Sequence, residues 1–181
     1  GTVGDAAILA RLDRNWQPQW RRQVGNGAVK SIVATSGGIV IGLEEPNSSG
    51  APLISLNSNG DLVWRVNIDK GSGESVERMV SLPKGGYAVL GSGLRARETA
   101  AGTQNESYTW VALLDGQGKV RNRPQTTGLG AAFGWAIAEA NDTLYITGRT
   151  DDGSPDAPSR LLLWAINLEG VELWARWDYP G

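Results

Sequence analysis

The sequence predicts an all-β fold made of repeated hairpins, and three observations lead to this prediction. The chain of 181 residues contains 25 glycines, a residue typical of tight turns. Eight tryptophans stand against one methionine and one phenylalanine, and aromatic residues are typical of strands. Short apolar segments alternate with turn-rich segments along the whole chain. A chain of this length can bury a core, so we expect one domain, 1–181.

A nine-residue pattern recurs four times, and each copy follows a short apolar segment. The copies LNSNGDLVW, from Leu56, and INLEGVELW, from Ile166, share a glycine at the fifth position and a tryptophan at the ninth. The copy LDGQGKVRN, from Leu114, keeps only the glycine, and LDRNWQPQW, from Leu12, keeps only the tryptophan. After Gly60 a more apolar face alternates with a less apolar one, which is the period of a strand. Each copy therefore predicts a strand, a turn and a second strand.

A second kind of hairpin lies between these copies. It spans residues 28–42, 75–91 and 131–148, and each example has an apolar strand, a turn and a second strand that ends in glycine. The turns contain Gly-Gly or Asn-Asp, which adopt the positive φ angles that tight hairpins need. The two kinds of hairpin alternate with a period of about 50 residues, and four strands per period are typical of β-propeller blades.

The number of hairpins predicts an incomplete ring. There are four hairpins of the first kind and three of the second. With the second kind as inner strands, the four-stranded antiparallel blades span about 28–68, 75–124 and 131–178, and an outer half-blade spans 7–24. Because propellers usually have about four to eight blades, we expect the remaining blades to come from a larger polypeptide or a second chain. A β-sandwich is the alternative fold.

The turn pattern also resembles a known family. A short segment with asparagine or aspartate, a glycine, three residues and a tryptophan resemble the tryptophan-docking repeat of the quinoprotein-like propeller superfamily, and GGYAVLG at 85–91 resembles related bacterial propeller repeats. The resemblance implies that the tryptophans pack against the neighbouring blade. The resemblance implies the scaffold of that family but not its redox function, because the chain has no cysteine for the cysteine pair of the family's quinone site. The residues to which it gives a blade-docking role are Trp20, Gly60, Trp64, Gly118, Gly170 and Trp174.

The composition excludes several classes of function. Seventeen basic and nineteen acidic residues give a formal net charge of −2, so nucleic acid is not an expected partner. The chain has no cysteine and no histidine, which removes thiolate ligands, a cysteine nucleophile and the commonest general base. No apolar run reaches the roughly 20 residues of a membrane-spanning helix. The lack of cysteine fits an exported bacterial protein as well as a cytosolic one, and we expect an extracellular or periplasmic location.

Three long polar links between the hairpins are predicted to form a binding rim. They span 43–52, 92–108 and 149–160. Binding residues commonly lie on loops that a rigid scaffold positions, although such links can also be solvated spacers. The candidate ligand or partner residues are the charged side chains of these links: Glu44, Glu45, Arg95, Arg97, Asp151, Asp152 and Asp156.

The acidic residues of the links do not predict a metal site or a cofactor. Calcium requires six or more converging oxygen ligands, whereas adjacent acids usually point apart into water. The stretch LNSNGDLVW partly imitates a calcium loop but has Val66 where the loop needs a glutamate, so it predicts a turn. We therefore predict a non-catalytic binding or scaffolding module that presents its rim to a protein or a glycan. The alternatives are a hydrolase or lyase completed by blades outside this chain, and a structural module that pairs through its open blade ends.

Overall fold

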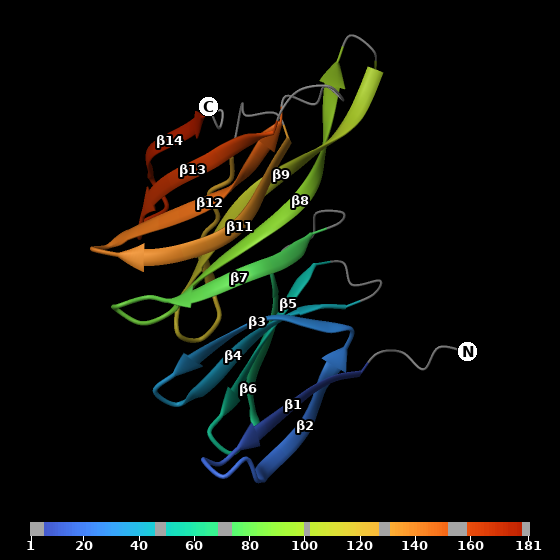
Figure 1. Cartoon of the computed structure of the whole chain (residues 1–181), viewed down its shortest axis with the longest axis vertical. Coiled ribbons are helices and arrows are strands. Elements are labelled where there is room, and N and C mark those ends of the chain that lie inside the picture. The colour runs from blue at the N-terminus through green and yellow to red at the C-terminus, as the bar shows by residue number, and fades with distance from the viewer. Residues whose placement is uncertain are drawn as a thin grey trace.

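The computed structural model describes residues 6–45, 50–68, 74–99, 102–126, 131–151 and 159–178 of the chain. The regular secondary structure of these residues consists entirely of β-strands. The fourteen strands form three four-stranded sheets and one two-stranded sheet (Figure 1). All strand pairs are antiparallel. The predicted all-β fold, with about three and a half blades of four antiparallel strands, is confirmed. Among the described residues no helix is long and apolar enough to cross a membrane.

Consecutive strands are neighbours in every sheet. The two-stranded sheet contains β1 (Ala6–Leu12) and β2 (Pro18–Asn26). The next sheet contains, in spatial order, β3 (Ala28–Thr35), β4 (Gly38–Glu44), β5 (Ala51–Asn57) and β6 (Leu62–Ile68). It is followed by the sheet of β7 (Ser75–Ser81), β8 (Tyr87–Thr99), β9 (Gly102–Leu114) and β10 (Val120–Asn122). The last sheet contains β11 (Ala131–Ala140), β12 (Thr143–Asp151), β13 (Arg160–Asn167) and β14 (Glu172–Asp178).

The sheets follow one another along the long axis of the molecule, from the two-stranded sheet to the β11–β14 sheet (Figure 1). The first strands of the three larger sheets are neighbours, because β3 contacts β7 and β7 contacts β11. The hairpins of the second kind in the sequence therefore form the inner strands of the blades, and those of the first kind form the outer strands.

Apolar side chains fill the space between successive sheets. Because neighbouring residues of a strand point to opposite faces, Val89 of β8 is buried toward the preceding sheet and Leu90 toward the following sheet. Both faces of the central sheet are thus covered, which explains why its strands are apolar at successive positions. Large side chains in these two interfaces include Leu53, Ile68, Val76 and Trp110 in the first, and Val111, Ile146, Leu162 and Trp164 in the second.

The nine-residue pattern forms the same turn four times. Its second residue is Asp13, Asn57, Asp115 or Asn167, and the side-chain Oδ1 of this residue accepts hydrogen bonds from the backbone N–H groups two and four residues later, at 2.8–3.1 Å. These are Asx turns, in which a short polar side chain satisfies the backbone locally. In LNSNGDLVW the Oδ1 of Asn57 is occupied in this way, so the stretch is a turn, as predicted.

The prediction of a polar loop at 92–108 is wrong, because 92–99 belong to strand β8 and 102–108 belong to strand β9. Strands β8 and β9 pair over thirteen residues each, from Tyr87 opposite Leu114 to Thr99 opposite Gly102. Their outer half projects beyond the rest of the sheet (Figure 1). A strand that is solvated on both faces needs no apolar alternation, since backbone pairing alone holds it, and its sequence therefore resembles that of a loop. The other two links are also shorter than predicted, because β4 extends to Glu44 and β12 to Asp151.

Candidate functional site

The predicted rim residues lie at the ends of the second strands of the three larger sheets. Glu44 ends β4, Arg95 and Arg97 lie in the outer half of β8, and Asp151 ends β12. The other predicted acid of the first link, Glu45, follows β4 directly. The last two candidates, Asp152 and Asp156, lie outside the described residues.

The two acids of the first link form ion pairs with cations of their own sheet. The Glu44 carboxylate lies 3.0 Å from Nζ of Lys30 on β3. The Glu45 carboxylate lies 2.7 Å from a guanidinium nitrogen of Arg65 on β6. Both pairs connect neighbouring segments of one blade, so these acids contribute to the blade and do not converge on the arginines of β8.

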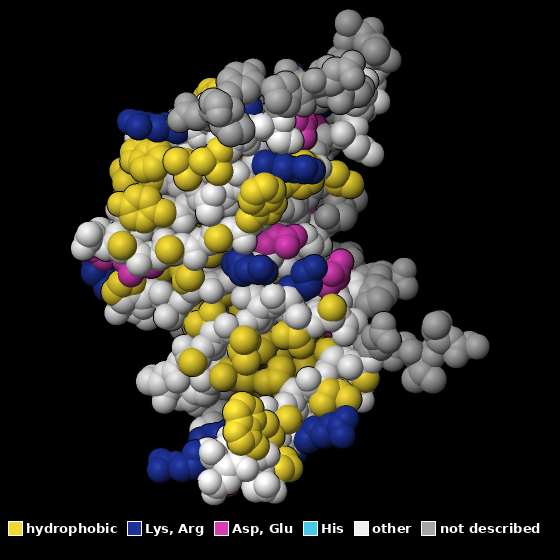
Figure 2. All heavy atoms as spheres, viewed as in Figure 1, with side chains coloured by type: hydrophobic (Ala, Val, Ile, Leu, Met, Phe, Trp, Pro, Cys, Tyr) yellow, Lys and Arg dark blue, Asp and Glu magenta, His cyan; other side chains and the backbone are white. Residues whose placement is uncertain are grey.

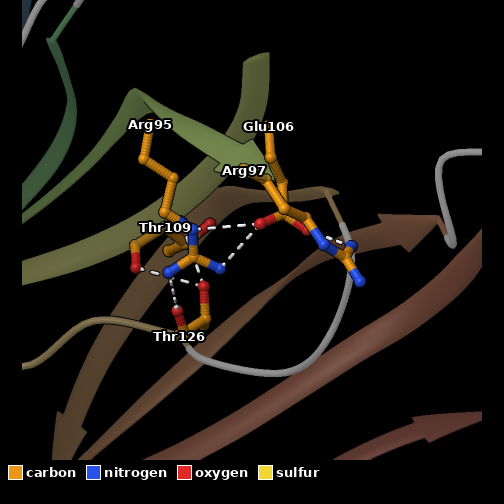
Figure 3. A network of polar contacts seen from close by, with 5 residues as sticks. All are labelled: Arg95, Arg97, Glu106, Thr109 and Thr126. Carbon is orange, nitrogen blue, oxygen red and sulfur yellow. Dashed lines mark hydrogen bonds and ion pairs between the residues drawn. The ribbon is translucent and has the colours of Figure 1, made fainter. Parts of the chain in front are cut away.

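The structure brings Arg95 and Arg97 together through an acid that the sequence did not single out. Glu106 on β9 accepts a hydrogen bond from Nε of Arg95 at 3.0 Å and another from Nη1 of Arg97 at 3.0 Å (Figure 3). The Glu106 side chain is only 10% exposed, whereas the Arg97 side chain is 56% exposed. The Glu106 carboxylate is therefore largely shielded from solvent, whereas the Arg97 guanidinium remains accessible to a partner.

The register of the hairpin explains this cluster. Arg95 stands directly opposite Glu106, and Arg97 stands opposite Gln104. Residues two apart on a strand point to the same face, so Glu106 has one directly opposite and one diagonal arginine. Arg95 also donates from Nη1 to the backbone oxygen of Thr126 at 3.2 Å, which ties the base of the hairpin to the segment that follows β10 (Figure 3).

A second polar cluster lies below the hairpin, around Glu74. The Glu74 side chain is fully buried, and its Oε1 accepts hydrogen bonds from the Tyr108 hydroxyl at 2.7 Å and from Nη2 of Arg123. The Arg123 guanidinium also lies over the Trp110 ring, 4.6 Å from its centroid. Since the guanidinium of Arg95 lies over the Tyr108 ring at 5.6 Å, the two clusters are continuous.

The segment after β10 positions Arg123 for this contact. The backbone N–H of Val111 donates to the oxygen of Pro124 at 2.9 Å, and the N–H of Thr126 donates to the oxygen of Thr109 at 2.9 Å. The segment thus lies along the edge of β9, where the Thr126 side chain also accepts a hydrogen bond from the Thr109 N–H at 3.1 Å. This return of the chain brings an arginine to a glutamate 49 residues earlier.

Burial raises the pKa of Tyr108 above its usual value, and the hydrogen bond and negative charge of Glu74 raise it further. The opposing influence of Arg123 is smaller. The phenol is therefore neutral at ordinary pH and acts as the donor to Glu74. Tyr108 thus connects the two clusters: its hydroxyl binds the buried pair of Glu74 and Arg123, and its ring contacts Arg95 of the hairpin.

Within the described residues the Glu74 cluster retains unused hydrogen-bonding capacity. The buried atoms Oε2 of Glu74, Nε of Arg123 and Nε1 of Trp110 have no hydrogen-bond partner there. A buried polar atom without a partner has a free-energy cost, so such atoms are rare in folded proteins. No group of three or more acidic side chains that could hold a metal ion occurs in the described part of the chain.

Four residues of these clusters were missed by the sequence interpretation: Glu74, Glu106, Tyr108 and Arg123. One signal was present for Glu106, because arginines at 95 and 97 share one face of a strand and a paired strand would supply an acid opposite them. No local signal existed for the pair of Glu74 and Arg123, which depends on the path of the chain after β10.

Five of the six predicted blade-docking residues lie in contacts between sheets, and Trp174 does not. The Trp20 ring lies against Gly60, where an added Cβ would be 2.9 Å from the ring, and the Trp64 ring lies against Gly118 at the same distance. Gly170 instead faces the side chain of Asn122, 2.6 Å from such a Cβ. Trp174 has no following sheet within the described residues and contacts Tyr145 of its own sheet, with the ring centroids 6.3 Å apart.

Together the stacked four-stranded sheets and the half-blade define a partial β-propeller. No protein-family model and no curated protein sequence matches the chain. Among solved structures, two single-residue variants of the Synechocystis apocarotenoid oxygenase are similar, with TM-scores of 0.53 and 0.52 and sequence identities of 12% and 13%. Each match covers 95% of this chain and 48% of the oxygenase chain, so the chain spans about half the length of that propeller. At this identity the similarity concerns the fold alone.

Proposed function

We propose that the chain is a non-catalytic binding module of a larger propeller, and that the projecting β8–β9 hairpin is its recognition element. The observation that carries this proposal is the cluster of Arg95, Glu106 and Arg97 on a hairpin that extends beyond its sheet. A two-stranded ribbon on a rigid scaffold can present side chains to a partner at low cost in conformational entropy.

The chemistry of the hairpin favours an extended, acidic segment of a protein partner. Within the described residues, strand pairing of positions 94–98 of β8 and 103–107 of β9 is only with each other, so the outer edges of these positions are not paired with a further strand. Such edges accept a further strand, as in other cases of peptide recognition by strand addition. Arg97 donates to Glu106 from Nη1, and its guanidinium is exposed, so its remaining N–H groups can reach a carboxylate of the partner.

A defined peptide tests this proposal. The probe is a fluorescein-labelled peptide of alternating threonine and glutamate, compared with a peptide in which glutamine replaces glutamate. Fluorescence anisotropy should report binding of the acidic peptide that is weakened at least tenfold by Arg97→Ala. The matched control is Arg121→Ala, which removes another exposed arginine of the same sheet, on β10. Equal binding by the two variants contradicts the proposal, as does binding on a glycan array without binding of the peptide.

A hydrolase or lyase completed by further blades is the second candidate, and it is favoured by the Oε2 of buried Glu74, which has no hydrogen-bond partner among the described residues. We rank this candidate lower because Arg123 and Tyr108 already occupy the other oxygen of Glu74, and Glu106 is held by two arginines. Neither acid is therefore poised as a free general acid or base. Screening of glycan substrates with the complete polypeptide and its Glu74→Gln variant tests this candidate, and turnover that disappears in the variant would support it.

A further inference from the structure

A groove lies between β2 of the two-stranded sheet and the β5–β6 hairpin of the next sheet. It has a volume of about 350 Å³, and the residues that line it include Arg22, Val24, Ile54, Leu62 and Arg65. We call it the β2–β6 groove. Both of its walls belong to described strands. A strand added to the two-stranded sheet beside β1 would lie on the side away from β2, so it would leave this groove open.

The larger groove at the same interface does not indicate a ligand. It has a volume of about 380 Å³ and lies between β1 and β3, where hydrophobic side chains gather in the space-filling view (Figure 2). Within the described residues β1 pairs only with β2, so a strand paired with the other edge of β1 would cover this groove.

Apolar side chains form the floor of the β2–β6 groove. Val24, Ile54 and Leu56 line it and are buried in the cluster between the two sheets. Leu62 also lines it but is 63% exposed, so this side chain lies at the mouth. An apolar molecule in the groove would therefore remove the exposed surface of Leu62 from water, which is favourable.

An arginine stands in this interface where the next interface has a valine. Arg22 follows Trp20 by two residues on β2, and Val66 follows Trp64 by two residues on β6. Residues two apart on a strand share a face, so both side chains point toward the following sheet. Val66 packs against the apolar cluster of the next interface, whereas Arg22 lines the groove. A cation thus occupies a position that is apolar in the equivalent contact.

A second arginine reaches the groove from the opposite wall. Arg65 stands directly opposite Ile54 in the register of β5 and β6, so it shares the face that is packed against the two-stranded sheet. Its guanidinium lies 2.7 Å from the Glu45 carboxylate. Arg22 forms no ion pair among the described residues, and its Nη1 donates to the backbone oxygen of Arg21 at 3.1 Å. Arg22 is therefore the cation of the groove whose charge is not compensated.

We propose that the β2–β6 groove binds a straight-chain alkyl carboxylate. The alkyl chain lies against Val24, Ile54 and Leu62, and the carboxylate accepts charge-assisted hydrogen bonds from Arg22 and from N–H groups of Arg65. This site is on a different sheet contact from the β8–β9 hairpin and does not depend on the function proposed for that hairpin.

The acids near the groove favour a head group with a single negative charge. Glu45 already pairs with Arg65, and Asp61 lines the groove with its Oδ2 accepting a hydrogen bond from Nδ2 of Asn57 at 3.2 Å. Like charges repel at short range, so these two carboxylates disfavour a doubly charged phosphate. A carboxylate brings one negative charge, which matches the uncompensated charge of Arg22.

Octanoate is the probe for this proposal. Methyl NMR spectra of the unmodified chain should show saturable shifts of Val24, Ile54 and Leu62 when octanoate is added. Acetate has the carboxylate without the chain, and octyltrimethylammonium has the chain with a cationic head. Both should bind more weakly than octanoate by about tenfold or more, since each lacks one of the two recognised parts.

Two variants test the role of Arg22. Arg22→Val installs the residue type found in the equivalent contact, and should weaken octanoate binding about tenfold or more, as expected for the loss of a charge-assisted hydrogen bond. The matched control is Arg21→Val, which removes the neighbouring arginine opposite Ala10, and should bind octanoate as the unmodified chain does.

Several outcomes would overturn the proposal. Octyltrimethylammonium that binds as tightly as octanoate would show that no anion is recognised. Equal weakening by Arg22→Val and Arg21→Val would show an effect of net charge alone. Absence of octanoate binding, or shifts elsewhere in the chain without shifts of Val24, Ile54 and Leu62, would exclude the groove. The comparison of the probes uses the unmodified chain, so it does not depend on the folding of either variant.

Discussion

The indole of Trp64 lies over Gly118 of the following sheet, so close that a Cβ on the glycine would be 2.9 Å from the ring. The same indole makes one further contact with this turn, because Trp64 Nε1–H donates to the backbone oxygen of Gly116. The contact therefore restricts the sequence on both sides. The turn needs a glycine, and the outer strand of the preceding sheet needs a flat side chain with a hydrogen-bond donor.

Substitution of this glycine should destabilise the protein. Gly118→Ala introduces an L side chain at φ 79°, which costs about 1–2 kcal/mol, and displaces the Trp64 ring as well. We expect a total loss of about 2–3 kcal/mol in the free energy of unfolding, measured by urea denaturation. The control is Gly116→Ala in the same turn, where an added Cβ meets no atom within 4 Å. A loss of equal size in the two variants would show that the ring contact is not responsible.

Two isoleucines at the same position of their sheets, one buried and one exposed, should differ in their contribution to the free energy of unfolding. Ile137 follows the bulge of β11, is 9% exposed and packs against the preceding sheet. Ile32 follows the bulge of β3 but is 56% exposed, in a groove of about 380 Å³ beside the free edge of β1. Ile137→Ala should lower the free energy of unfolding by about 2–4 kcal/mol, as expected for a buried isoleucine, and Ile32→Ala by less than about 0.5 kcal/mol.

These two variants are compared by the midpoints of urea unfolding curves under the same conditions. A large loss for Ile32→Ala would mean that something covers this residue in solution, and sedimentation of the unmodified protein would then identify self-association as the cause or exclude it.

Stability should fall at alkaline pH because of Tyr108. Its pKa is raised in the folded protein, chiefly by burial, so the folded state favours the neutral phenol. This contribution is fully present below the usual tyrosine pKa of about 10 and is lost as the pH rises through the higher folded value. Burial also raises the pKa of Tyr87, which therefore acts in the same direction. Tyr108→Phe should flatten the decline in unfolding midpoint above pH 10, and an unchanged decline would leave Tyr87 as the source.

Neutralising Glu106 should loosen the hairpin without unfolding the sheets. Glu106→Gln keeps the shape of the side chain but removes the charge that holds Arg95 and Arg97, and a partly buried pair of this kind contributes about 1–3 kcal/mol. Hydrogen–deuterium exchange should become faster in 94–99 and 102–107 and stay unchanged in β12 and β13. Exchange that is equally accelerated in all sheets would contradict this local role.

The blade scaffold could be predicted from the sequence because its signals are local. Each outer hairpin turns at an Asx residue whose side chain bonds to backbone N–H groups two and four residues later, and three of the four turns have a glycine at the position that needs positive φ. Alternation of more and less apolar residues then gives the strands. Such contacts lie within a few residues of one another, so a single copy of the pattern contains all that is needed to recognise it.

The candidate site could be predicted only in part. The sequence identified Arg95 and Arg97 but assigned them to a loop, because a ribbon solvated on both faces has no apolar alternation to mark its strands. The acid between the arginines required the register of β8 against β9, in which Arg95 stands opposite Glu106. The predicted acids Glu44 and Glu45 were bound within their own sheet by cations on β3 and β6.

The sequence by itself determined the turns and most of the strands of the three and a half blades in this chain, since these depend on side chains that act on their own or adjacent backbone. Tertiary structure alone decided which side chains meet. It placed Arg123 against Glu74, 49 residues away, and Trp64 against a turn 52 residues away. The physical reason is that backbone conformation responds to neighbours in the chain, whereas ion pairs and ring contacts depend on how sheets stack, which no single segment encodes. Trp174 is 40% exposed, although its turn has the same spacing of glycine and tryptophan as the turn before Trp64.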